Sequence, residues 1–201
     1  QHGLDLVLDV SEADDRSFGF RGHVRTRGLQ HATAPWLMFI DADMVFGPHY
    51  LTRVMQQAQK HAGEHRVLAT GRSSMSFDDG YKVVDQADYK APIHEAYNTI
   101  LKSTKTWPAA GGRASGAGFG QLVNIANQKA FAASQNRPFA YVPETYGRDN
   151  DGLSNRPYLT RSDRAYRMWY GGVVALPNNL DFIHLNHYRK GDPQWSPELQ
   201  H

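Results

Sequence analysis

The clearest hydrophobic pattern in the chain is an apolar run, Trp36–Ile40, that leads directly into the acidic tripeptide Asp41-Ala42-Asp43. An uninterrupted apolar run of strand length is typical of a strand buried on both faces, as in α/β sheets that are covered by helices. Ligands of such sheets bind in the crevice beyond the carboxyl ends of the strands. We therefore expect Asp41 and Asp43 to face a site rather than the core.

Other segments alternate between helical and strand patterns, which predicts an α/β fold. Apolar residues at helical spacing predict helices at about His23–His31, Tyr50–Ala62, Asp85–Ile100 (kinked or split at Pro92), Asn127–Ser134 and Ser162–Tyr170. Strands are predicted at Leu4–Val10, Arg66–Thr70, Gln121–Ile125, Val173–Leu176 and Asp181–Leu185, and loops at Lys102–Pro108, Gly111–Gly120 and Asn136–Tyr158. In the first helix, Val24, Gly28 and Ala32 lie four residues apart, so we expect this face to pack closely against a strand.

Composition narrows the class of protein. A chain of 201 residues, 40% of them hydrophobic, is long enough to bury one sizeable core. The net charge of +2 and the lack of any block of five Lys or Arg argue against nucleic-acid binding. The chain has no cysteine, which excludes disulfides and thiolate metal sites. No apolar run approaches the roughly 18 residues of a membrane span.

The acidic tripeptide is the best candidate for chemistry. Two carboxylates this close repel each other unless a positive group lies between them, and hard cations such as Mg²⁺ or Mn²⁺ with phosphate oxygens are the usual solution. The alternative is an ordinary turn in which the aspartates cap the following backbone. The position of the pair after a buried strand, with an arginine-rich helix before it and Gly47-Pro48 after it, favours the metal site.

A longer pattern surrounds this motif. The segment Phe20–Leu29, followed by Ala32, Trp36-Leu37 and Asp41–Met44, resembles the nucleotide-sugar half of GT-A glycosyltransferases of the inverting family 2 type. Within that group it is most similar to chondroitin-polymerase-like and galactosyltransferase-like domains. The resemblance covers residues 18–60 well and the last half loosely, and Arg27 stands where the family usually has Asn.

The resemblance implies a GT-A (Rossmann-like) fold, a mixed, mainly parallel sheet flanked by helices. It also implies a metal-dependent transfer of a hexosyl or N-acetylhexosaminyl group from a nucleoside diphosphate sugar to a hydroxyl of a glycan or other acceptor, as in polysaccharide biosynthesis. The expected cofactor is Mn²⁺ or Mg²⁺ and the first expected donor is a UDP-sugar. We expect one catalytic domain over residues 1–201, incomplete at its N-terminus relative to the family and belonging with further domains of a longer protein. The expected location is cytoplasmic, with membrane association only through partners or other regions.

The resemblance also assigns binding roles to particular residues. Asp43 would coordinate the metal, and Asp41 would lie near the ribose or in the metal shell. The arginines of the preceding helix are expected at the donor: Arg25 or Arg27 would contact phosphate or hold the acidic motif, and Arg21 belongs to the same group. For these arginines a surface position with a buried stem is an equal alternative. The family commonly supplies a histidine after its last strand, and of the pair in His184-Leu185-Asn186-His187 the second fits better as a metal ligand.

Three carboxylates are candidates for the general base. Inverting transfer needs one carboxylate within hydrogen-bond reach of the acceptor hydroxyl. Asp149 is the first choice and Asp151 the second, because Tyr146–Asp151 is the nearest match to the family's acidic motif, although Arg148 stands where a Glu is expected. A shifted alignment offers Asp163 instead, with Arg167 and Gly171 after it. The alternatives are solvated loop positions for the first two and helix capping for Asp163.

Two other functions stay open at this point. A non-catalytic module that binds a nucleotide sugar or a carbohydrate is favoured by Arg148, whereas the intact acidic tripeptide favours the enzyme. A metal-dependent phosphohydrolase also uses Asp and His, but it normally carries more His/Asp pairs than this sequence shows.

Overall fold

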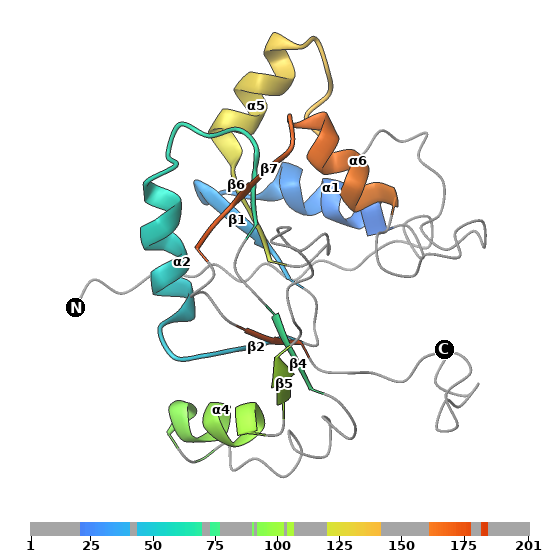
Figure 1. Cartoon of the computed structure of the whole chain (residues 1–201). Coiled ribbons are helices and arrows are strands. Elements are labelled where there is room, and N and C mark those ends of the chain that lie inside the picture. Colours follow the sequence, from blue (N-terminus) through green and yellow to red (C-terminus); the bar gives the residue numbers. More distant parts are fainter. Residues whose placement is uncertain are drawn as a thin grey trace, which may run out of the picture.

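The computed structural model of the chain describes residues 21–40, 44–69, 73–76, 90, 92–102, 104–106, 120–141, 161–177 and 182–184 (Figure 1). The described helices are α1 (Arg21–His31), α2 (Tyr50–Gln59), α4 (Ile93–Lys102), α5 (Ile125–Ser134) and α6 (Arg161–Trp169). The described strands are β1 (Trp36–Phe39), β2 (Met44–Phe46), β3 (Val67–Ala69), β4 (Ser73–Ser76), β5 (Thr104–Thr106), β6 (Gln121–Asn124), β7 (Val173–Ala175) and β8 (Phe182–His184). The predicted strand Leu4–Val10, the first five residues of the predicted helix Asp85–Ile100 and most of the glycine-rich segment lie outside the described residues. The described part of that helix begins at Ile93, directly after Pro92.

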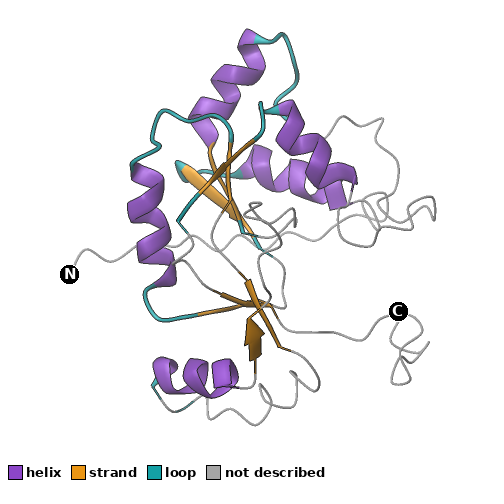
Figure 2. Cartoon of the chain, in the orientation of Figure 1, coloured by secondary structure: helices purple, strands orange, loops and turns teal. Residues whose placement is uncertain are grey.

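The described strands form two four-stranded sheets. The order of the first sheet is β1-β6-β3-β7, and that of the second is β2-β8-β4-β5. Each sheet contains one parallel pair, β3–β7 in the first and β4–β8 in the second, and the other described pairs are antiparallel. Figure 2 shows the helices around these strands. The predicted α/β fold with a mixed sheet is confirmed, although the described strands contain fewer parallel pairs than a mainly parallel sheet implies.

The first sheet separates two hydrophobic cores. Leu37 and Phe39 of β1 pack into one core with residues of α1, α5 and α6, while Trp36 and Met38 pack into the other with residues of α2. This alternation follows from the two-residue period of a strand. Helices therefore cover both faces of the sheet (Figure 1), and the prediction that the apolar run packs on both sides is confirmed for Trp36–Phe39, whereas Ile40 is 51% exposed.

Helix α2 follows the predicted pattern closely. Its buried residues are Tyr50, Val54 and Ala58, which lie four residues apart. The helix begins after His49, which has a φ of 60°, and it ends at Gln59 rather than at the predicted Ala62. The chain tightens at that end, since the Lys60 N–H donates to the carbonyl of Gln57, three residues back.

Two predictions about strands are corrected by long-range pairing. The predicted loop Lys102–Pro108 contains strand β5, whose residues pair with β4, as in Ser74 opposite Thr106. The predicted strand Trp36–Ile40 ends one residue earlier, at Phe39, and the next strand, β2, begins at Met44 in the other sheet. Neither outcome has a local cause, because both depend on partners far along the chain.

The buried face of α1 also differs from the predicted one. Val24 is 44% exposed and Gly28 is exposed, with no atom within 4 Å of the position that a Cβ would occupy. The buried residues of this helix include Arg25 and Leu29. The predicted close packing of Gly28 against a strand is therefore wrong. The prediction considered apolar residues only, whereas the face of the helix that is buried contains an arginine.

Replacing Gly28 with alanine is expected to raise the free energy of unfolding by about 0.5–1 kcal/mol, because alanine has the higher helix propensity and restricts the unfolded chain. Chemical denaturation followed by circular dichroism measures this change. The matched control is Gly171→Ala, at a φ of +81° and with His65 Nε2 3.4 Å from the added Cβ, where a loss of stability is expected. A loss of stability in the Gly28 variant would contradict the exposed, uncrowded position.

Candidate active site

The acidic tripeptide 41–43 connects the two sheets. The described chain stops at Ile40, directly after β1, and resumes at Met44, the first residue of β2. In the antiparallel pairing of β2 with β8, Met44 lies opposite His184. The strand that leads toward His187 therefore lies beside the strand that leaves the acidic motif.

The predicted site residues divide into two groups. Those that lie outside the described residues are Asp41, Asp43, Asp149, Asp151 and His187. The described ones are Arg25, Arg27 and Asp163, and Arg21 is described only as the first residue of α1. Two of the described residues, Arg25 and Asp163, are in direct contact, although they were predicted to have different roles.

Arg25 and Asp163 form a buried ion pair between α1 and α6. The Arg25 Nη1 donates to Asp163 Oδ1 at 2.6 Å, and the side chains are 9% and 1% exposed. The same nitrogen donates to the hydroxyl of Tyr141 at 2.9 Å, and this hydroxyl in turn donates to Asp163 Oδ1. We call Arg25, Tyr141 and Asp163 the polar cluster. It joins residues that are more than 100 positions apart in the sequence.

The hydroxyl of Tyr141 is well supplied with partners. It also accepts a hydrogen bond from Gln121 Nε2 of β6 at 3.3 Å. Burial, the largest cause, raises the pKa of Tyr141 well above its usual value. The hydroxyl therefore keeps its proton at neutral pH and can donate it to the carboxylate of Asp163, which satisfies a buried charge that would otherwise be costly.

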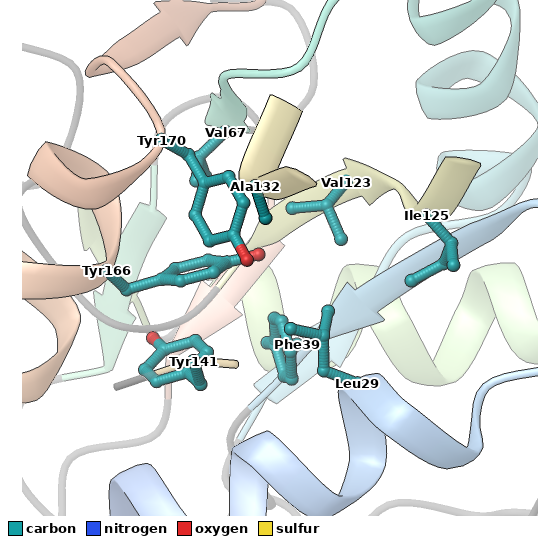
Figure 3. Close-up of a cluster of buried hydrophobic side chains, with 9 residues drawn as sticks. All are labelled: Leu29, Phe39, Val67, Val123, Ile125, Ala132, Tyr141, Tyr166 and Tyr170. Carbon is teal, nitrogen blue, oxygen red and sulfur yellow. The ribbon is translucent and has the colours of Figure 1, made fainter. Parts of the chain in front are cut away.

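Aromatic rings enclose the polar cluster and connect it to β1. The ring of Tyr141 stacks on Tyr166 with centroids 4.0 Å apart and meets the edge of Phe39 at 5.1 Å (Figure 3). The guanidinium carbon of Arg25 lies 5.5 Å from the centre of the Phe39 ring. Since Phe39 is the last residue of β1, the cluster packs directly against the strand end that precedes Asp41.

These contacts bear on the roles predicted for Arg25 and Asp163. The guanidinium of Arg25 is held by Asp163 and Tyr141 inside the protein, which does not favour a phosphate contact. Asp163 does lie in the first turn of α6, on the same helix as Arg167, whose Nε donates to the Asp163 carbonyl. Its side chain, however, is directed to Arg25 and Tyr141. A base must reach the acceptor hydroxyl, so this geometry favours a positioning role for Asp163.

Tyr141 and Gln121 also belong to this arrangement, although neither was predicted as a site residue. The sequence contains one indication that Arg25 is buried: it lies one helical turn before Leu29, an apolar residue, so the two share a face of the helix. A buried arginine needs an acidic or polar partner. Nothing in the local sequence indicates which of the distant acidic residues or tyrosines provides it.

The described part of the chain contains neither a cluster of metal-binding side chains nor a helix that could span a membrane. Among those residues, no group of three or more His, Asp or Glu side chains is placed to hold a metal ion. The helices described here are too short, or too polar, to cross a bilayer.

The sequence model of the family described as Glycosyl transferase family 2 matches residues 19–117, just under half of the chain. This match includes α1, β1, the acidic tripeptide and α2. The matched region is similar to a family 2 glycosyltransferase domain, a family whose fold is of the GT-A, Rossmann-like type. No curated protein and no solved structure matches the chain.

Proposed function

We propose that this domain is a metal-dependent, inverting glycosyltransferase that moves a hexosyl or N-acetylhexosaminyl group from a nucleoside diphosphate sugar to a hydroxyl acceptor. The family supports glycosyl transfer in general. The observation that supports the metal-dependent mechanism is the chain order at the junction between the two sheets. The acidic tripeptide follows β1 of one sheet and precedes β2 of the other, and β2 pairs with β8.

Chain connectivity supports a shared site for the proposed metal ligands. Consecutive Cα atoms are about 3.8 Å apart. The Cα of Asp43 is therefore about 3.8 Å from that of Met44, and the Cα of His187 is at most about 11 Å from that of His184. Met44 and His184 are paired across two neighbouring strands. Asp43 directly precedes one member of this pair, and His187 follows the other by three residues.

The proposed ligands suit the proposed ion. Carboxylate oxygens and one imidazole nitrogen form a donor set that accepts Mn²⁺ or Mg²⁺ and leaves positions for phosphate oxygens. In this proposal Asp43 and His187 hold the ion and Asp41 contacts the ribose or the metal shell. When bound, the ion supplies positive charge that stabilises the diphosphate as it leaves. Arg21 and Arg27, on the helix before β1, are the proposed phosphate contacts.

The transfer itself is a single displacement. The acceptor hydroxyl oxygen forms a bond to the anomeric carbon, the bond from that carbon to the diphosphate oxygen breaks, and the hydroxyl proton passes to a carboxylate. We propose Asp149 as this base, followed by Asp151. Asp163, the third candidate, is better suited to hold the protein framework because its carboxylate is buried against Arg25.

One observation favours a second function. If the family's acidic motif aligns with Asp163, its third acidic position is engaged in the ion pair with Arg25, and Arg148 stands where a Glu is expected in the other alignment. A domain in which neither alignment supplies a working base would be a nucleotide-sugar-binding module rather than an enzyme.

Removing the metal separates these functions. Nucleotide release from a panel of UDP-hexoses and UDP-N-acetylhexosamines is measured on the chelator-treated protein, before and after Mn²⁺ is restored. The enzyme is expected to release UDP only with Mn²⁺. Binding of a donor by calorimetry without any release identifies the module, and release that ignores the chelator contradicts the proposed metal dependence.

A further inference from the structure

We infer that the polar cluster of Arg25, Tyr141 and Asp163 is a positioning device that holds together the two ends of the segment carrying the proposed base. This inference rests on the proposed function, because the base, Asp149, lies within residues 142–160. Tyr141 is the last described residue before that segment, and Asp163 lies in the first turn of the helix that follows it.

The contact between the two ends is direct and buried. The Tyr141 hydroxyl donates to Asp163 Oδ1, and both side chains are almost fully excluded from solvent. Arg25 donates to both of them, so α1 holds the two ends at once. Joining the ends of a segment of this length removes much of its conformational freedom.

A second set of contacts relates this device to the proposed metal site. Phe39, two residues before Asp41, packs edge-on against Tyr141 and lies beneath the guanidinium of Arg25. One cluster therefore contacts both the last residue of the strand that leads to the acidic tripeptide and the described residues on either side of the segment that carries Asp149. Displacing a catalytic group by about 1 Å can reduce a rate by about 100-fold. A cluster that keeps the proposed base and the proposed metal ligands in a constant relative position would therefore increase the rate of transfer.

The sequence provides a closely matched pair of variants. Tyr141→Phe removes the hydroxyl that joins the two ends and keeps the ring. Tyr166→Phe removes a hydroxyl of equal burial from the same aromatic stack, but that hydroxyl donates to Gln128 Oε1 of α5 at 2.6 Å. Each variant removes one buried hydroxyl and keeps its ring. The Tyr141 hydroxyl donates to Asp163 and accepts from Arg25 and Gln121, whereas the Tyr166 hydroxyl donates to Gln128, so only the first variant loses a contact between the ends of the segment.

The first readout is steady-state kinetics. Tyr141→Phe is expected to lower kcat about 10- to 100-fold with the donor KM within about twofold. The reason is that the variant keeps the ring that packs against Phe39, and with it the strand that leads to the proposed metal site, but loses the hydroxyl that joins the ends of the segment carrying the base. Tyr166→Phe is expected to keep kcat within about threefold of the wild type. Equal losses in the two variants, or an unchanged kcat in Tyr141→Phe, would overturn the inference.

The second readout does not need activity, so it separates this inference from the proposed function. Hydrogen–deuterium exchange of peptides from residues 142–160 is compared between the wild type and the two variants. Exchange several-fold faster in Tyr141→Phe alone supports the positioning device, even if the wild type proves to be a binding module. Unchanged exchange in Tyr141→Phe, or an equal increase in both variants, contradicts it.

Discussion

Replacing Asp43 with alanine is expected to reduce metal-dependent nucleotide release by about 1,000-fold, which corresponds to roughly 4 kcal/mol of transition-state stabilisation. The physical reason is the loss of a ligand to the ion that offsets the charge of the leaving diphosphate. Metal affinity is expected to fall as well, because the remaining carboxylate and imidazole make a weaker site. Turnover is measured over a range of Mn²⁺ concentrations, and metal binding is measured by calorimetry.

A control shows that this effect is specific to the acidic tripeptide. Glu95→Ala removes an exposed carboxylate from α4 and is expected to leave turnover and the midpoint of thermal unfolding unchanged. If the Asp43 variant keeps wild-type turnover at every Mn²⁺ concentration while folding normally, the tripeptide is not the metal site.

Replacing Arg25 with methionine is expected to cause the largest loss of stability in the described chain, about 3–5 kcal/mol of unfolding free energy. Methionine fills much of the arginine volume, but it leaves the carboxylate of Asp163 buried without its charged partner. The midpoint of thermal unfolding is expected to fall by about 10 °C. Differential scanning calorimetry and urea denaturation measure both quantities.

Two further variants identify the cause of this loss. In Arg25→Met with Asp163→Leu no charge is left buried, so part of the lost stability is expected to return. Arg66→Met breaks a more exposed ion pair with Glu64, and its effect is expected to be much smaller. A double variant that is less stable than Arg25→Met alone would show that packing, rather than the uncompensated charge, causes the loss.

Elements with a local apolar period could be predicted from the sequence. The helix beginning at Tyr50 shows Leu51, Val54 and Ala58 at helical spacing, and the structure places these residues toward the second core. Strand β3 and helix α5 were predicted within two residues of their ends for the same reason. In these segments the apolar residues whose spacing predicts the element are close neighbours in the sequence.

The features that could not be predicted depend on distant partners. Strand β5 exists because Thr104–Thr106 pairs with β4, and Lys105 is too polar to indicate a buried strand. The partner of Arg25 lies 138 residues away on α6, and no local pattern specifies it. For the same reason the sequence left Arg25 between a phosphate contact, a support for the acidic motif and a surface position, and Asp163 between a base and a helix cap. The structure brings the two together in one buried ion pair.

The most direct measurement is the anomalous scattering of manganese in crystals grown with Mn²⁺ and UDP. We expect one strong peak between the diphosphate oxygens and the side chains of Asp43 and His187, with Asp41 at the ribose or in the metal shell. A bound nucleotide with no metal at these side chains, or a metal held by other residues, would contradict the proposal that this junction of two sheets stabilises the departing nucleotide.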